Sequence, residues 1–232
     1  GKITAKQVDT LIQEHYSDAS SEHTVQPGIV YISFPTESGT LYSKQELTEL
    51  YTVCQKHNIP LFIDGARLGY GLMAKKNDVT FEDIANLCDV FYIGGTKVGA
   101  LFGECIVILN DLYKKDFRYS IKQHGGMLAK GRMLGIQFEE LFKDNRYLTI
   151  SKHAIDMATI LSEGFQSKGY HFYFPAETNQ LFPIFKNTKL EELSKEFAFT
   201  PWAKVDETHT AVRFVTSFMT KRENIEYLLT KI

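Results

Sequence analysis

The stretch that decides the fold is Pro60–Asp64, which reads PLFID. Its apolar residues, Leu61 to Ile63, end directly on the carboxylate of Asp64. A short run of this kind, rich in branched and aromatic side chains, is typical of a strand buried on both faces of a sheet. The stretch therefore predicts an interior strand that carries an aspartate at its carboxyl end.

Three further apolar runs of similar length and composition predict more strands. They lie at Ile29–Phe34, Val90–Ile93 and Cys105–Leu109. Helical patterns separate the first strands: one opens with a capping box at Ser43 and runs to about Asn58, and a shorter one opens at Thr80. This alternation predicts an α/β fold with a mostly parallel sheet. The last run follows a connection too short for a helical crossover, so we expect that strand to be antiparallel.

The second half of the chain has a different pattern, with long helices followed by short strands. Helices are expected at Met127–Phe142 and Arg146–Lys168, and after capping boxes that begin at Thr188 and Thr220. Strand-like runs are found at Tyr170–Phe174, Gln180–Phe185 and Val212–Thr216. We therefore expect a small α+β domain at residues 146–232, after a larger α/β domain at residues 1–145.

Composition excludes several classes of function. The 232 residues carry a formal net charge of −2, and basic residues do not cluster, so we expect no nucleic-acid partner. No apolar stretch reaches the roughly 18 residues of a transmembrane helix, so we expect no membrane partner. The three cysteines and the histidines lack metal-ligand spacing, so we expect no metal site. A cytoplasmic location is the default expectation.

The segment YIGGTKVGA at Tyr92–Ala100 contains the first candidate catalytic residue, Lys97. This lysine follows a predicted buried strand and stands among small residues. Burial of an ammonium group is costly unless it is paired or its pKa falls, and a lysine with a lowered pKa is a good nucleophile toward a carbonyl. The alternative is a surface lysine in a glycine-rich hairpin loop. The segment is not a Walker A loop, because Val98 follows the lysine where Ser or Thr is needed.

Asp64 and Arg67 form the second candidate, because ligands of open α/β sheets bind at the carboxyl ends of the strands. Asp64 could instead cap the next helix, or the two side chains could simply pair with each other. Asp64 and Lys97 would both be explained as ligands of one cofactor, pyridoxal phosphate (PLP). An aspartate keeps the ring nitrogen of that cofactor protonated, and a lysine holds its aldehyde as an imine.

Five segments, in this order, resemble the low-specificity threonine aldolases of the β-eliminating lyase family. They are IDGARL at 63–68, GTKVGA at 95–100, GGM at 125–127, TNQLF at 178–182 and VRFVT at 212–216. The resemblance implies part of the large domain of a type I PLP fold at residues 1–145, followed by the small C-terminal domain. It also implies PLP as the cofactor.

The resemblance implies a role for each matching residue. Lys97 becomes the Schiff-base lysine, Asp64 the partner of the ring nitrogen, and Thr96 a hydroxyl beside the phosphate. Arg67 and Arg213 become the residues that hold the substrate carboxylate. A structural salt bridge is the alternative for Arg213, although a bidentate clamp is what this chemistry needs from an arginine.

The implied function is a PLP-dependent carbon–carbon lyase, a homodimer or homotetramer acting on small β-hydroxy-α-amino acids, which cleaves threonine to glycine and acetaldehyde. β-Elimination or transamination is the alternative, favoured by Glu37, which stands where many threonine aldolases have a histidine. A second alternative is an inactive fragment or a non-enzymatic α/β subunit. The family has a further N-terminal segment with the phosphate cradle, so we expect a truncated chain that binds PLP poorly or not at all by itself.

Overall fold

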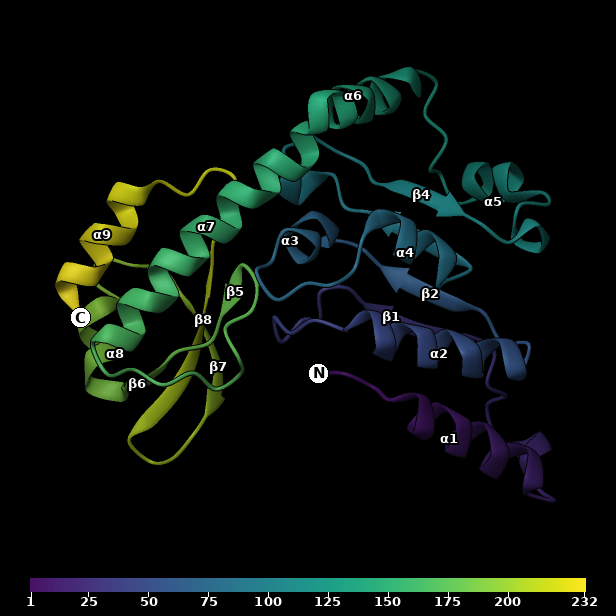
Figure 1. Ribbon diagram of the computed structural model, residues 1–232, viewed down its shortest axis with the longest axis horizontal. Helices are drawn as coiled ribbons and strands as arrows, with labels where there is room; N and C mark the ends of the chain where they lie inside the picture. The colour runs from purple at the N-terminus through teal and green to yellow at the C-terminus, as the bar shows by residue number, and fades with distance from the viewer.

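The computed structural model describes all of residues 1–232 as two halves bridged by one long helix, α7 (Figure 1). The helices before this bridge are α1 (Ala5–Ser17), α2 (Lys44–Lys56), α3 (Leu68–Leu72), α4 (Phe81–Asn86), α5 (Phe117–Gln123) and α6 (Arg132–Phe142). The bridge and the helices after it are α7 (Arg146–Ser167), α8 (Asn187–Leu193) and α9 (Arg222–Lys231). No helix has both the length and the apolar character needed to cross a bilayer.

The first half contains a four-stranded sheet in the order β1-β2-β3-β4. Its strands are β1 (Val30–Ser33), β2 (Leu61–Asp64), β3 (Val90–Ile93) and β4 (Cys105–Ile108). The first three strands are parallel, and β4 is antiparallel to β3. The predicted α/β class and the predicted direction of each strand are therefore confirmed. Because β1, β2 and β3 are parallel, their carboxyl ends lie side by side at the same end of the sheet.

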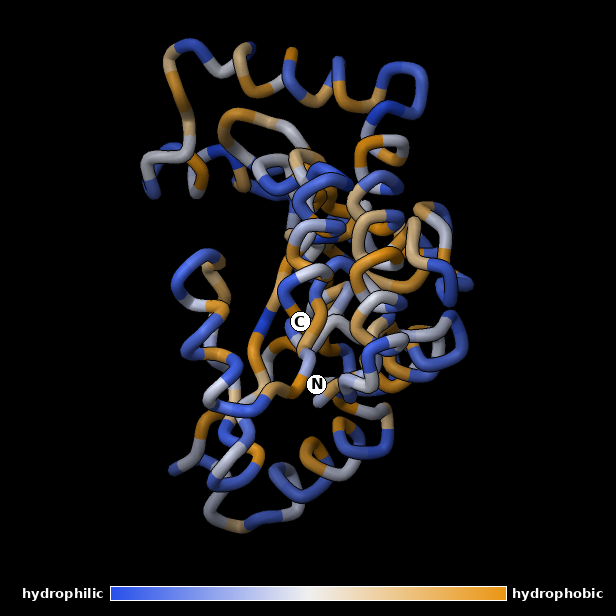
Figure 2. The backbone as a smooth tube through the Cα atoms, turned by 90° about the vertical axis from the view of Figure 1, so that its left-hand side faces the viewer, coloured by the Kyte–Doolittle hydropathy of each residue, from blue (hydrophilic) through white to orange (hydrophobic).

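The capping boxes predicted in the first half are confirmed. In α2 the hydroxyl of Ser43 accepts a hydrogen bond from the backbone N–H of Glu46, and the Glu46 carboxylate accepts one from the backbone N–H of Ser43. The same reciprocal pair begins α4 at Thr80. Leu47, Leu50 and Cys54 then form the buried face of α2. In Figure 2, blue and orange segments alternate along the helices, as expected for helices that bury one face.

The second half contains a small antiparallel sheet built around its longest strand, β8. The strands are β5 (Gln180–Leu181), β6 (Ile184–Lys186), β7 (Thr200–Lys204) and β8 (His209–Val215). Each of the other three pairs with β8. The sequence did not predict β7, because Pro201 lacks the N–H that a central strand requires. This strand lies at an edge, with an irregular register between Pro201 and Ala203.

Two strand predictions in this half are wrong in detail. Tyr170–Phe174 is not a strand, and its only bridge joins Phe172 to Pro183. The run Gln180–Phe185 is divided into β5 and β6 by Phe182 and Pro183. Proline cannot donate to a ladder, which explains why the pairing is interrupted at that position.

The helix starts in the second half also differ from the prediction. The helix expected from Met127 begins at Arg132, and neither α8 nor α9 has a side-chain cap. The Thr220 hydroxyl accepts a hydrogen bond from the backbone N–H of Ser217 instead of capping α9. A capping box needs the threonine directly before the first helical residue. Thr188 instead lies inside α8, and Thr220 lies one residue before Lys221, the N-cap of α9.

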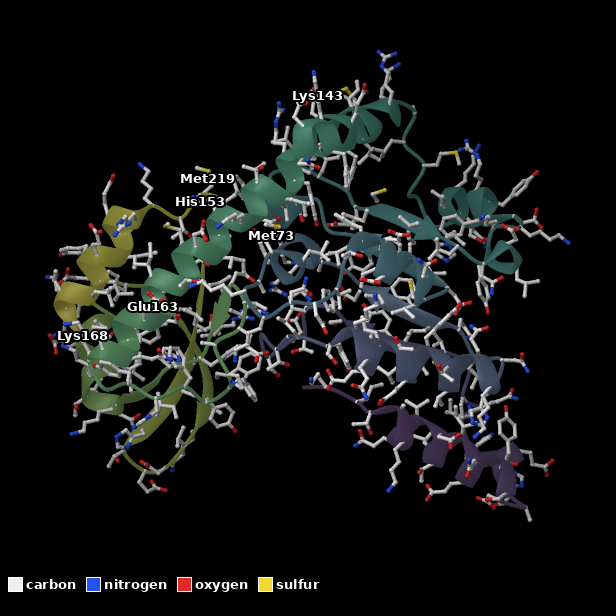
Figure 3. The ribbon with its side chains drawn as sticks, in the orientation of Figure 1. Met73, Lys143, His153, Glu163, Lys168 and Met219 are labelled. Carbon is white, nitrogen blue, oxygen red and sulfur yellow. The ribbon has the colours of Figure 1, made fainter.

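Helix α7 belongs to both hydrophobic cores. Tyr147 and Ala154, in its first turns, pack into the 26-residue cluster of the first half. Met157 and Phe165 pack into the 11-residue cluster of the second half. A left-handed turn at Asp144 and Asn145 separates α6 from α7, next to Lys143, which is labelled in Figure 3. The kink coincides with the predicted boundary at residue 145, but the shared helix joins the halves, and the domain division stays a prediction.

Candidate active site at the strand ends

The candidate site lies where β1, β2 and β3 end. Its backbone is drawn together by the glycines after β2 and β3. The N–H of Gly94 donates to the carbonyl oxygen of Gly65 over 2.8 Å. A Cβ atom on Gly65 would lie 1.9 Å from the carbonyl oxygen of Tyr92. Only glycine therefore allows the segments that carry Asp64 and Lys97 to approach this closely.

Asp64 is half-buried at the tip of β2 and accepts three hydrogen bonds. The hydroxyl of Tyr31 donates to Oδ2 over 2.5 Å, the hydroxyl of Tyr92 donates to Oδ1, and the N–H of Ala66 donates to Oδ1 over 2.9 Å. Burial acts to raise the pKa of Asp64. These hydrogen bonds and the positive charge of Lys97 outweigh burial and hold the pKa below its ordinary value. Asp64 is therefore a stable anion.

Lys97 is exposed, so the expectation of a buried lysine is wrong for this chain. It lies in the 3₁₀ turn Thr96–Val98, in which successive side chains point about 120° apart. Val98 is the residue of this turn that enters the core, and Lys97 faces outward. Its backbone is fixed, because the hydroxyl of the buried Tyr70 donates to the carbonyl oxygen of Lys97. The amine is thus accessible, and its positive charge contributes to the lowered pKa of Asp64.

Thr96 has a partner that the sequence reasoning missed. Its hydroxyl donates to Oε1 of Glu104 over 3.1 Å, and the N–H of Gly95 donates to Oε2 of the same carboxylate over 2.5 Å. Glu104 therefore holds the turn that carries Lys97. The signal available in the sequence was an acidic residue directly after Gly103, at the start of β4.

Arg67 is paired with Glu37 rather than with Asp64. Its Nη1 lies 2.8 Å from Oε1 of Glu37, and the side chains of Arg67 and Glu37 are 13% and 57% exposed. This pair joins the ends of β1 and β2. Sequence reasoning named Glu37 only as a departure from the family and did not find this contact, because the two residues are 30 positions apart.

Arg213 comes from the second sheet, on β8, and forms no ion pair. Its guanidinium carbon lies 5.7 Å from the centroid of the Trp202 ring, and its buried Nε has no hydrogen-bond partner. The predicted alternative of a structural salt bridge is therefore absent. An arginine with an unsatisfied buried donor can accept a carboxylate ligand.

Residues 178–182, which read TNQLF, connect the second sheet to the carboxyl ends of β1, β2 and β3. The hydroxyl of Thr178 donates to the carbonyl oxygen of Gly39 over 3.0 Å, and Nε2 of Gln180 donates to that of Glu37 over 3.3 Å. Gln180 also stands opposite Val215 of β8. The structure thus connects the strand that carries Arg213 with the tip of β1. The roles predicted for Lys97, Asp64, Thr96, Arg67 and Arg213 stay predictions.

Comparison with known proteins gives the family. The beta-eliminating lyase family model matches residues 1–188. The low specificity L-threonine aldolase of Pseudomonas sp. (strain NCIMB 10558) is 32% identical over 175 residues, which are 74% of this chain and 50% of that protein. The enzyme of the same name from Pseudomonas aeruginosa is 30% identical over the same shares.

A solved structure agrees with this assignment over nearly the whole chain. Leishmania major threonine aldolase superposes with a TM-score of 0.94 and 41% identity, over 99% of this chain and 66% of that one. The chain spans about half the length of the curated relatives it matches. The chain belongs to the beta-eliminating lyase family.

Proposed function

We propose that this chain is part of a PLP-dependent carbon–carbon lyase that cleaves β-hydroxy-α-amino acids, with threonine giving glycine and acetaldehyde. The observation that carries this proposal is the half-buried Asp64 anion, held by two phenols within the electrostatic range of the accessible Lys97 amine. The relatives named above are threonine aldolases, which favours this reaction over elimination and transamination.

The residues present fit PLP. When bound, PLP supplies an electron sink for the bond-breaking step. Asp64 would pair with the ring nitrogen, and its lowered pKa keeps the negative charge that this pairing needs. The amine of Lys97 would hold the cofactor aldehyde covalently. Thr96 would serve the phosphate only if its hydroxyl exchanged Glu104 for that ligand.

Arg213 and Arg67 are the proposed ligands of the substrate carboxylate. The unpaired Nε of Arg213 supports this role directly. The guanidinium carbon of Arg213 also lies 5.7 Å from the centroid of the Trp202 ring, and this cation–π contact helps to orient the group. For Arg67 the role requires sharing the guanidinium with Glu37.

We also propose a homodimer or homotetramer. Large apolar side chains are exposed around β4, α5 and α6, including Leu101 at 86%, Leu112 at 80% and Tyr119 at 77%. Apolar exposure of this extent is typical of a surface that another chain covers. A cytoplasmic location stays a prediction.

The test is to incubate the purified protein with PLP, reduce it with borohydride and map the labelled peptide. We expect a pyridoxyl group on Lys97, and loss of the label in Lys97→Ala. Lys115→Ala is the control, because Lys115 is an exposed lysine beyond the opposite end of β4. A label on another lysine would overturn the site.

The reaction is tested by product analysis with threonine. Glycine and acetaldehyde are expected from the lyase. An oxo acid with ammonia would instead show elimination. A protein that takes no label and forms no product would be the non-enzymatic alternative.

A further inference from the structure

We propose that Glu37 is a catalytic residue that takes the proton from the β-hydroxyl of the substrate while the bond between Cα and Cβ breaks. This inference rests on the proposed function and deepens it, because cleavage of a β-hydroxy-α-amino acid needs a proton acceptor at the hydroxyl.

Three carboxylates lie at these strand ends, and two of them are occupied. Asp64 accepts three hydrogen bonds. Glu104 uses one oxygen for the N–H of Gly95 and the other for the hydroxyl of Thr96. Glu37 uses only Oε1, which accepts from Arg67, and its Oε2 has no hydrogen-bond partner. Glu37 is therefore the carboxylate with an oxygen available to a ligand.

The position of Glu37 is fixed by groups on both sides. Arg67, only 13% exposed, holds the carboxylate at 2.8 Å. Gln180 of the second sheet donates to the backbone carbonyl of Glu37 over 3.3 Å. A carboxylate that a largely buried arginine orients, and whose second oxygen is free, can act as a proton acceptor.

A cavity of about 210 Å³ lies beside β1 and next to Glu37. Gly1, Ile3, Tyr31, Ile32, Ser33, Thr36, Glu37 and Tyr42 line it, and Asp64 does not. Tyr31 connects this cavity with Asp64, because its hydroxyl donates to that carboxylate. Burial, the hydrogen bond to Asp64 and the charges of Asp64 and Glu37 raise the pKa of Tyr31 to about 12. Tyr31 therefore stays a donor, and it cannot take the proton in place of Glu37.

The hydroxyl proton passes to Oε2 of Glu37, and the electron pair of that O–H bond becomes the second bond of the aldehyde carbonyl. The electron pair of the broken carbon–carbon bond stays on Cα, which takes up a proton to give glycine; PLP, when bound, would supply the electron sink at that carbon. Glu37 then carries the proton, which it releases to solvent through its exposed side.

Arg67 and Arg213 have different roles in this arrangement. Arg67 is engaged by Glu37, so its main task is to position that carboxylate. Arg213, whose Nε is unpaired, is then the main ligand of the substrate carboxylate.

The test separates cleavage from a reaction that needs no hydroxyl. The purified PLP-loaded protein is assayed for threonine cleavage and for exchange of the α-proton of glycine in D₂O. Glu37→Gln keeps the size and the acceptor toward Arg67 but cannot take a proton at neutral pH. We expect cleavage to fall by about 100-fold or more, the range for loss of a general base, and exchange to fall by only a few fold. Glu37→Asp should recover part of the cleavage.

Two controls exclude a structural explanation. Glu49→Gln alters an exposed glutamate of α2 and should cleave threonine like the parent protein. The melting temperature of cofactor-free Glu37→Gln should stay within a few degrees of the parent value, which a merely structural role would not allow.

Each remaining outcome has a distinct meaning. Glu37→Gln that cleaves threonine within a few fold of the parent, or that loses cleavage and exchange equally, would overturn the role of Glu37 alone. A parent protein that binds PLP at Lys97 and performs neither reaction would overturn the proposed function, and this inference with it.

Discussion

The hydroxyl of Tyr31 lies 2.5 Å from Oδ2 of Asp64, on the neighbouring strand. Tyr31 stacks on Phe62 with 5.2 Å between ring centroids, and Phe62 lies 6.2 Å from the ring of Tyr92, whose hydroxyl reaches the other oxygen of Asp64. A row of aromatic rings across three strands thus places two phenol donors on one carboxylate.

Removing either phenol donor should lower the activity at acidic pH. Tyr31→Phe and Tyr92→Phe each delete a hydrogen bond that lowers the pKa of Asp64, so that pKa should rise. Asp64 would then become protonated at higher pH, and the acid limb of the activity profile should move upward. A hydrogen bond to a charged group contributes about 1.5–3 kcal/mol, so we expect a loss of roughly tenfold or more in kcat/KM near that limb.

The measurement is a pH profile of threonine cleavage with PLP in excess. Tyr16→Phe is the matched control, because Tyr16 is 58% exposed and lies on α1. An acid limb that stays in place in both variants would mean that Asp64 is not the ionising group.

Glu104 should stabilise the turn that carries Lys97. In Glu104→Gln the charge that accepts from Gly95 and Thr96 is lost, and one acceptor oxygen becomes a donor. We expect amide hydrogen exchange in residues 94–104 to accelerate about tenfold, equivalent to about 1.4 kcal/mol. Glu139→Gln, on the exposed side of α6, is the control. Unchanged exchange would show that the turn is held by Tyr70 and Val98 alone.

The sequence predicted much of the first half and little of its side-chain pairing. Asp64 could be placed because an apolar run ending on a carboxylate defines the tip of a buried strand. Its donors Tyr31 and Tyr92 are 33 and 28 positions away, and only the register of three strands brings them together. Arg67 had an aspartate three residues before it in sequence, yet its partner is Glu37 of the neighbouring strand end. Such pairings depend on tertiary geometry that local patterns do not contain.

The second half was harder to predict because its elements are short. β5 has two residues and β6 has three, too few to show a period. What stabilises them is the aromatic core below the sheet. Phe165 of α7 is fully buried there, and its ring contacts those of Tyr170, Phe172, Phe185 and Phe214.

Phe165→Ala should therefore destabilise the second half severely. Truncating a buried phenylalanine costs about 3–5 kcal/mol, since the neighbouring rings cannot fill the space. Phe165→Leu should cost less. Phe102→Ala, at a residue that is 40% exposed, should change the free energy of unfolding little. Urea unfolding followed by Trp202 fluorescence measures the effect in this half, and equal losses at positions 165 and 102 would contradict the packing described.

An ion-pair cluster between α1 and α2 should make stability depend on pH. Oδ1 of Asp9 lies 2.6 Å from Nε2 of His57 and 2.8 Å from Nζ of Lys56. The hydrogen bonds from His57 and then Lys56 lower the pKa of Asp9 from 3.8 to about 2. A group whose pKa is lower in the folded state stabilises the fold above its unfolded pKa, and this contribution disappears as the pH falls through the folded value.

Asp9→Asn should accordingly lower the melting temperature at neutral pH, and the difference from the parent should shrink as the pH falls from 3.8 to about 2. Asp144→Asn is the control, because Asp144 is exposed and its left-handed backbone, at φ 53°, suits asparagine. Melting curves across this pH range measure both variants. A deficit in Asp9→Asn that stays constant down to pH 2 would mean that residue 9 acts through helix packing, because only the ionised carboxylate can lose its contribution in acid.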